Sequence, residues 1–314
     1  MNILGIDIGG TSIKGAIVNE NGEIISDKIS LPIVAGEDQE ITIFKLTSLI
    51  KEFLVKNSDK KVSGIGLGIP GSLDTKNGVV DFSNNLKWKN LKIVEIMQNS
   101  LDLPVKISND ANVATLGEAR FGAGKQYKNI VMLTLGTGVG GGVVIDGKLF
   151  EGNLGKGTEL GHITLVYNGP QCSCGRKGCL EMYASATALI RQTKEAMEHN
   201  PNSLLWKEVN SIDEVDGKTV FDAERKGDKI ASIVVAHYIS YLGEGILNYL
   251  NIFRPECVVL SGGIAKEGAN LTDRLTKYLE DQEYGYPFAP KTVIKTAELG
   301  YNAGIIGAAS LLFK

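Results

Sequence analysis

The sequence of 314 residues has no run of basic residues and no segment in which arginines alternate with aromatic side chains. It carries 33 Lys and Arg against 36 Asp and Glu, so its formal net charge is -3. Proteins that bind nucleic acids through phosphate contacts need a positively charged surface. We therefore expect no nucleic-acid partner.

Features of export and of membrane insertion are also missing. No positively charged leader with a cleavage site precedes the first predicted strand, and no apolar stretch approaches the roughly 20 residues that cross a bilayer. We expect a cytoplasmic protein without a membrane partner. Its length favours two lobes, because single hydrophobic cores rarely grow beyond about 250–300 residues.

Cysteine is scarce, with four in the chain, yet three of them lie close together and near a histidine: His162, Cys172, Cys174 and Cys179. Zinc takes four sulfur and nitrogen ligands in a tetrahedron, and four protein ligands are typical of a structural site. The alternative is two disulfides or inert core thiols, which a reducing compartment disfavours. Cys257 lies in an apolar run and is interpreted as a core residue.

The first part of the chain alternates strand and turn signals. Strands are predicted at 3–8, 13–18 and 23–29. The loop Gly9-Gly10-Thr11 joins the first two, and the Asn21-Gly22 turn leads into the third.

The same order recurs later in the chain. A strand at 130–135 is followed by a glycine loop at 136–142, a strand at 143–145 and an Asp146-Gly147 turn. This repetition predicts an internally duplicated α/β fold. Apolar spacing and further apolar runs predict helices at 39–56, 91–101, 230–253 and 304–313, and strands at 62–69, 105–108 and 257–260.

The two glycine loops are interpreted as phosphate clamps. Backbone N–H groups and hydroxyls near glycine can approach phosphate oxygens closely. Asp7, at the end of a buried strand, suits hydrated Mg²⁺. The predicted nucleotide-binding residues are Asp7, Gly9, Gly10, Thr11, Ser12 and Lys14 in the first loop, Gly136, Thr137, Gly138 and Gly140 in the second, and Gly262 and Gly263 under the adenosine.

These loops match neither common nucleotide motif. No Gly-Lys-Ser/Thr ending is present, which excludes a P-loop, and strands rather than helices follow both loops, unlike a dinucleotide fingerprint. Taken singly, each loop could be an ordinary hairpin turn. Together, on duplicated halves, they favour a nucleoside triphosphate.

Asp110 stands between a predicted strand end and a helix that begins at about Ala111. One interpretation is a helix N-cap, a position that Asp favours. The other is a catalytic base that orients a hydroxyl and accepts its proton during phosphoryl transfer. Both interpretations can hold together.

Polar side chains around the cysteine cluster point to sugar recognition. Glu159 and Glu181 flank the predicted zinc ligands, and Asn85 lies in another polar segment. Carboxylates and amides pair with adjacent sugar hydroxyls. Each Glu by itself could be a surface charge. His162 can bind metal through one ring nitrogen and sugar through the other.

These residues, together with Pro70-Gly71 and the Asn85–Trp88 segment, resemble the ROK family of sugar kinases over nearly the whole chain, and within it most of all the bacterial glucokinases. The resemblance implies an actin-like ATPase (ribonuclease H-like) fold with two lobes around a cleft. One lobe would span 1–112 with the C-terminal helix 304–314 returning to it, and the other, with the zinc motif, 113–303.

The resemblance also implies roles for individual residues. Asp110 would be the general base, ATP with Mg²⁺ the phosphate donor, and His162 with the three cysteines the zinc site. Hexose would be bound by Gly71, Asn85, Asn109, Asp110, Glu159, His162 and Glu181. Members of the family are commonly homodimers or homotetramers.

The predicted function is phosphorylation of the 6-hydroxyl of glucose by ATP. Another hexose (mannose, fructose, allose or an N-acetylhexosamine) remains an alternative, because residues outside the motifs decide between epimers. A sugar-sensing regulator without turnover is a further alternative. Repressors of this family carry a helix-turn-helix domain before the fold, and here the first strand begins at Asn2, so we expect no repressor.

Overall fold

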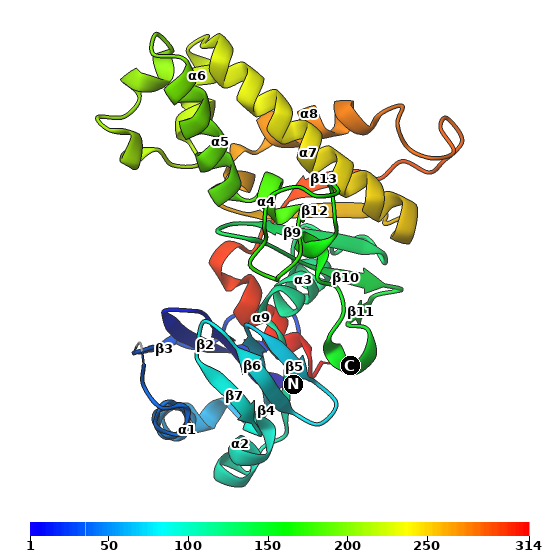
Figure 1. Cartoon of the computed structure of the whole chain (residues 1–314). Coiled ribbons are helices and arrows are strands. Elements are labelled where there is room, and N and C mark those ends of the chain that lie inside the picture. Colours follow the sequence, from blue (N-terminus) through cyan, green and yellow to red (C-terminus); the bar gives the residue numbers. More distant parts are fainter. Residues whose placement is uncertain (35, 314) are drawn as a thin grey trace. The chain divides into compact units, whose positions relative to one another are not determined.

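The computed structural model describes residues 1–34 and 36–313. It has an α/β fold with two five-stranded sheets and one three-stranded sheet (Figure 1). The chain forms two compact units: Met1–Lys128, Gly142–Thr158 and Glu298–Lys314 in the first, Asn129–Gly141 and Glu159–Ala297 in the second. The lobes expected at 1–112 and 113–303 stay a prediction, and Lys314 of the expected helix lies outside the described residues.

The first sheet has the strand order β3-β2-β1-β4-β8. Its strands are β1 (Asn2–Ile8), β2 (Ser12–Asn19), β3 (Ile29–Pro32), β4 (Val62–Ile69) and β8 (Val105–Asn109). The first three pair antiparallel, whereas β4 is parallel to both β1 and β8. β1 and β4 are nearly continuous apolar or glycine runs, as expected for strands covered on both faces.

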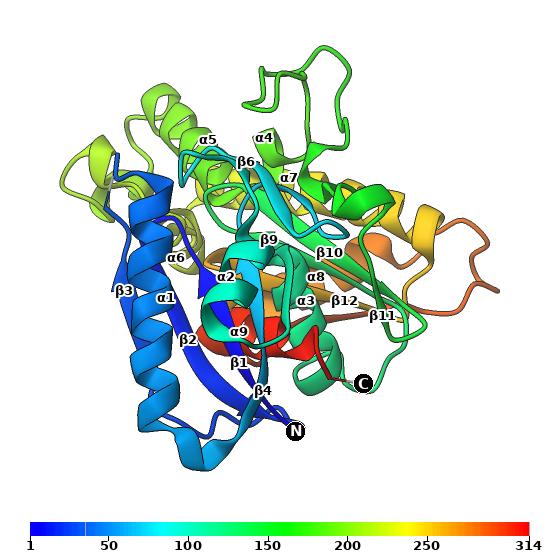
Figure 2. The same ribbon diagram turned by 90° about the horizontal axis from the view of Figure 1, so that it is seen from below.

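One face of this sheet is covered by α1 (Gln39–Lys56) and α2 (Ile93–Leu101), and α1 lies along β3 (Figure 2). Helix α1 begins where the Asp38 side chain accepts a hydrogen bond from the amide of Glu40. Its apolar positions recur at helical spacing, so Ile43, Leu46 and Ile50 enter one core with the sheet.

The other face is covered by α3 (Asp110–Phe121) and α9 (Ala303–Ser310), which pack on each other. Ile305 and Ile306 of α9 form a second buried cluster with Ile3 and Val18. The helices approach so closely that a Cβ atom at Gly307 would lie 1.6 Å from the carbonyl oxygen of Val113. Only glycine fits there.

A small antiparallel sheet follows β4 in the same unit: β5 (Ser72–Asp74), β6 (Val79–Ser83) and β7 (Trp88–Leu91). This sheet was not among the predicted elements. Its strands have three to five residues, too short for an alternating pattern to be recognised.

The other five-stranded sheet repeats the order of the first, as β11-β10-β9-β12-β13. Its strands are β9 (Ile130–Leu135), β10 (Val139–Ile145), β11 (Lys148–Phe150), β12 (Cys257–Gly262) and β13 (Val293–Thr296). β10 and β11 form a hairpin, and β12 is parallel to both β9 and β13. The duplication expected from the sequence is confirmed by this repeated order.

Helices of the second unit are α4 (Glu181–Ala184), α5 (Ala186–His199), α6 (Thr219–Arg225), α7 (Lys229–Phe253) and α8 (Ala269–Leu279). Helix α7 packs against the other four (Figure 1). Short 3-10 helices complete the fold at Ser58–Lys60, Asn153–Gly155, Leu160–His162, Leu204–Lys207, Ile212–Glu214, Ile264–Glu267 and Gly300–Asn302.

Helix α7 departs from the expectation that no stretch is long and apolar enough to cross a bilayer. It has 25 residues, and its most apolar window has a mean hydropathy of 1.4. More than half of that window, 56%, is buried inside the protein. Core helices of globular proteins pass the same length and composition test, so α7 is weak support for a membrane span.

Most predicted elements are confirmed, including helix α1 with both its ends and strand β4. The strand predicted at 23–29 is wrong: a single bridge joins Val18 to Ile24, and β3 begins only at Ile29. The loop predicted at 136–142 is also too long. Strand β10 begins at Val139, because the glycines that follow allow close packing, as where Gly141 meets the Met132 carbonyl.

Candidate active site

In the first unit, predicted site residues gather at one edge of the sheet. β1, β4 and β8 are parallel, and Asp7, Gly71 and Asn109 lie at or just after their carboxyl ends. The register places Asp7 beside Gly68 and Ile69 beside Asn109. Ligands of open α/β sheets bind at such carboxyl ends.

The first glycine loop turns tightly between β1 and β2. The Gly9 amide donates to the Ser12 carbonyl at 2.9 Å, and Gly10 and Thr11 are exposed. A Cβ atom at Gly10 would have the Asn85 side chain as its neighbour, at 4.0 Å. The loop that we predicted to clamp phosphate and the Asn85 residue that we predicted to bind sugar are therefore neighbours.

Asp7 is a half-buried carboxylate that lies against α9. A Cβ atom at Gly304 would come within 2.6 Å of its carboxylate. Burial, followed by the negative charge of Asp110, raises the pKa of Asp7 to about 6, while Lys14, its cross-strand partner, opposes the shift. Concentrated negative charge of this kind is what a divalent cation would relieve.

The start of α3 corrects one interpretation of Asp110. The N-cap is Asn109, whose Oδ1 accepts from the amides of Ala111 at 2.9 Å and Asn112 at 3.4 Å. Asp110 is the first helical residue, and its Oδ1 also accepts from the Ala111 amide at 2.9 Å. Because Asn109 supplies the cap, Asp110 is not needed for it.

Asn109 also reaches the turn after β4. Its Nδ2 donates to the Gly71 carbonyl at 3.4 Å. Gly71 has a φ of 125°, and a Cβ atom there would lie 2.4 Å from the Phe82 carbonyl, so the position requires glycine. The structure thus connects two of the predicted sugar-binding residues directly.

In the second unit, the second glycine loop and the Gly262-Gly263 pair also meet at strand ends. β9 and β12 are parallel, and Leu135 pairs with Gly262. Gly136–Gly138 follow β9, and the Thr187 hydroxyl donates to the Thr137 carbonyl at 2.8 Å. Gly140 lies within β10. The corresponding edge of the first sheet carries the first glycine loop.

Glu181 connects this loop to the cysteine cluster. Its Oε2 accepts from the Val139 amide at 3.0 Å, and its Oε1 lies 3.5 Å from Cys172 Sγ. A Cβ atom at Gly138 would lie 2.3 Å from Oε2. The carboxylate that we predicted to bind sugar is therefore held between the predicted nucleotide loop and the predicted zinc ligands.

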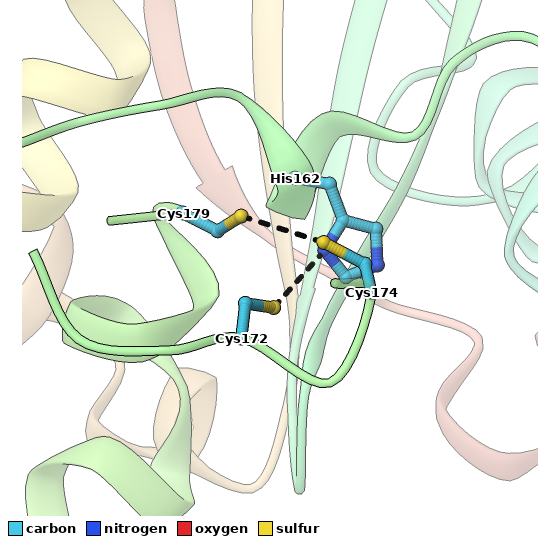
Figure 3. A group of neighbouring side chains, drawn as sticks. All are labelled: His162, Cys172, Cys174 and Cys179. Atoms are coloured by element: carbon cyan, nitrogen blue, oxygen red, sulfur yellow. Dashed lines mark hydrogen bonds between the residues drawn. The ribbon is translucent and has the colours of Figure 1, made fainter. Parts of the chain in front are cut away.

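The four predicted zinc ligands converge, with one donor atom from each lying within 4.8 Å of the others (Figure 3). His162 approaches Cys172 Sγ through Nδ1 at 3.6 Å, and the sulfurs of Cys174 and Cys179 are 3.6 Å apart. Burial and the neighbouring thiols raise the pKa of Cys179 to about 12. The donor set suits zinc, whose positive charge favours thiolates.

Glu159 is exposed and stands just before the 3-10 helix that carries His162, whose amide donates to the Glu159 carbonyl at 3.0 Å. Each unit therefore assembles its own share of the predicted site.

One group of polar residues near the site was not predicted from the sequence. Ser108 and Asn112 flank Asn109-Asp110, and Glu151 and Thr158 form hydrogen bonds to them. The glycines among residues 151–158 were the feature of the sequence that could have marked this segment as a tightly packed loop near the site.

Comparison with known proteins identifies the family. The profile described as "ROK family" matches residues 3–314. The chain belongs to the ROK family. The glucokinase of Thermotoga maritima is 37% identical over 99% of this ROK protein and 97% of its own length.

A crystal structure of a ROK family glucokinase from Streptomyces griseus, in complex with glucose and AMPPNP, superimposes with a TM-score of 0.80. It is 33% identical, with 99% of each chain covered. The xylose repressor of Caldicellulosiruptor bescii is 31% identical over 99% of this ROK chain and 78% of the repressor. The family thus includes relatives named as kinases and relatives named as repressors.

Proposed function

We propose that this ROK protein is an ATP-dependent glucokinase that phosphorylates the 6-hydroxyl of glucose. The observation that carries this proposal is the end-to-end similarity to proteins named glucokinase. The sheet edges add to it, because carboxylate, amide and glycine-loop groups gather where phosphoryl-transfer sites are built. The proposed fold is of the actin-like ATPase class, with lobes 1–112 plus 304–314 and 113–303 around a cleft.

ATP would be held by glycine loops from both units. Gly9, Gly10, Thr11 and Ser12 would donate to phosphate oxygens in one, and Gly136, Thr137, Gly138 and Gly140 in the other, with Gly262 and Gly263 under the adenosine. Lys14 would add positive charge. Asp7 would hold Mg²⁺ through water, and that ion would offset charge on the phosphates. The raised pKa of Asp7 is what we expect of a carboxylate whose negative charge a bound cation would balance.

Asp110 would orient the sugar hydroxyl and accept its proton. Its place as first helical residue supports this role, because the backbone amides at a helix start favour a negative charge there. Gly71, Asn85, Asn109, Glu159, His162 and Glu181 would bind the remaining hydroxyls. A site built this way rejects analogues that lack those hydroxyls.

Zinc would be held by His162, Cys172, Cys174 and Cys179. Four protein ligands leave no open coordination position, so the metal would be structural. It would order the segment between Glu159 and Glu181 and would leave Nε2 of His162 available for the sugar. We further propose a homodimer or homotetramer in the cytoplasm.

The test is ADP release with Mg-ATP across a panel of glucose, mannose, fructose, allose and N-acetylhexosamines, each against a control without sugar. Release should be highest with glucose. Asp110→Asn should lower kcat by about 10²–10⁴-fold while the melting temperature stays at or above that of wild type, since the side-chain oxygen can still accept from the Ala111 amide and repulsion of Asp7 is removed. Highest release with another hexose would change the substrate and keep the mechanism.

The similarity to repressors favours one second candidate, a sugar-binding regulator without turnover. Calorimetric binding of glucose without ADP release, from a folded sample with bound zinc, would establish that alternative. Wild-type turnover in Asp110→Asn would overturn the assignment of the base.

A further inference from the structure

Residues 151–158, which we call the anchor loop, hold both sides of the Asn109-Asp110 pair. The Ser108 hydroxyl, at the end of β8, donates to Glu151 Oε1. The Thr158 hydroxyl shares its one proton between Asn112 Oδ1, in the first turn of α3, at 3.1 Å and the Gly157 carbonyl at 2.7 Å. The loop is tied to the residue just before the pair and to the second residue after it, and these contacts lie within the first unit.

Both attachment points are buried. Ser108 is 0% exposed and Asn112 is 2% exposed. Burial also raises the pKa of Glu151, whereas the Ser108 hydroxyl lowers it. Polar groups at such depth are costly unless each finds a partner, so these hydrogen bonds strongly constrain where the loop lies.

The anchor loop is itself fixed at other points. The Gly157 amide donates to the Glu151 carbonyl at 2.7 Å, which closes the loop on itself. The Thr75 amide donates to the Leu154 carbonyl at 3.2 Å, and Lys156 forms an ion pair with Asp81 at 2.8 Å. The loop can therefore hold α3 in place instead of moving with it.

Thr158 adopts a strained backbone conformation. Its φ is 62°, in the left-handed region that β-branched residues rarely enter. Such strain persists where the surroundings fix the conformation, and it concentrates at functional sites. The next residue is Glu159, one of the proposed sugar ligands.

We infer that Glu151 and Thr158 are positioning residues that fix the proposed base, Asp110, through Ser108 and Asn112. This inference rests on the proposed kinase function. Asp110 is the first residue of α3, where the backbone N–H groups have no partners within the helix. Holding the residue before the pair and the second residue after it limits movement of this helix start, and small displacements of a reacting group lower turnover steeply.

Thr158→Val keeps the branched shape and removes the hydroxyl. We expect it to lower kcat about tenfold, with the KM for ATP within about twofold of wild type, because only the base is displaced. Thr158→Ser keeps the hydroxyl and should have a kcat close to that of wild type. Glu151→Ala should lower kcat similarly, whereas Glu151→Gln, which can still accept from Ser108, should retain most of it.

Thr193→Val is the matched control, since Thr193 is a buried threonine of α5 whose hydroxyl donates to the Leu189 carbonyl of its own helix at 2.8 Å. It should leave kcat unchanged. Thr158→Gly covers the possibility that Thr158→Val does not fold, because glycine relieves the strained φ. We expect its melting temperature to equal or exceed that of wild type while its kcat falls.

Hydrogen–deuterium exchange gives a readout that does not need turnover. The amides of residues 109–113 should exchange faster in Thr158→Val and Glu151→Ala than in wild type or Thr193→Val. Wild-type kcat together with unchanged exchange in these variants would overturn the inference. If the wild type shows no kinase activity, the proposed function fails, and the exchange comparison still decides whether the loop anchors α3.

Discussion

The charge of Asp110 acts on Asp7 across the sheet edge of the first unit, and together with burial it raises the pKa of Asp7 to about 6. Asp7 lies in β1 and Asp110 just after β8, two strands of one sheet that are separated by β4. Such a pair favours a bound cation or a bound proton. The relation predicts a pH dependence of stability.

Asp7→Asn should stabilise the metal-free protein above pH 6 by about 1–3 kcal/mol. Unfolded, Asp7 loses its proton near pH 3.8, and folded, near pH 6. Between these values the folded chain binds more protons, so the contribution of Asp7 to stability falls as pH rises. Urea unfolding at pH 4 and pH 7.5 measures the difference, which should fall to well under 1 kcal/mol (about 0.6) at pH 4, where Asp7 of the unfolded chain is only about half ionised.

Asp27→Asn is the control for that comparison, because Asp27 is exposed and lies outside the site. It should change stability little at either pH. An equal change in the free energy of unfolding of Asp7→Asn at both pH values would contradict the raised pKa of Asp7.

Asn109→Ala should lower the free energy of unfolding by about 1 kcal/mol, because α3 loses its cap. Asn109→Ser keeps a capping hydroxyl but loses the amide that donates to Gly71. We expect its stability to stay near wild type and its KM for glucose to rise. Unfolding curves and glucose titrations separate the two roles; a normal KM in Asn109→Ser would rule out sugar binding by the amide.

Cys174→Ala should reduce bound zinc from about one ion per chain to almost none, because three ligands hold the ion poorly. The melting temperature should fall with it. Cys257→Ala is the matched control: this buried thiol of β12 lies outside the cluster. Elemental analysis of both variants decides the point, and full zinc content in Cys174→Ala would refute the site.

Gly307→Ala should destabilise the protein by at least about 2 kcal/mol, because the added Cβ meets the Val113 backbone and forces α9 away from α3. Helix propensity alone gives the opposite sign, since alanine favours a helix by about 1 kcal/mol over glycine. The sign of the change in denaturant unfolding therefore tests the close packing directly.

The elements predicted correctly from the sequence are those whose own residues show the periodicity or the capping residue of a helix or strand. Helix α1 has apolar residues at helical spacing and begins at the capping residue Asp38. The predicted zinc ligands lie close together along the chain. In both cases the local sequence was enough for the prediction. The strand predicted at 23–29 failed because the Ile17 amide of β2 donates to the Ser26 side chain, so regular pairing with β2 starts only at Ile29. Strand propensity is a weak guide to such choices.

Within the candidate site, Asp7, Gly71 and Asn109 gather at one edge because β1, β4 and β8 pair in parallel, which the local sequence of no single strand reveals. The bonds of Glu151 to Ser108 and of Glu181 to Val139 could not be predicted. Each joins residues about 40 positions apart, and nothing in either local segment marks the partner.

The chain passes between its two units after Lys128, Gly141, Thr158 and Ala297, so neither unit is one continuous segment. During synthesis, β1 and β2 leave the ribosome early, but Ile305 and Ile306, which cover one face of them, emerge almost a whole chain later. The buried cluster that includes these two residues cannot form until then, and strand surface left uncovered in this way is prone to aggregate during translation. Truncations near the C-terminus should therefore impair the solubility of the N-terminal sheet.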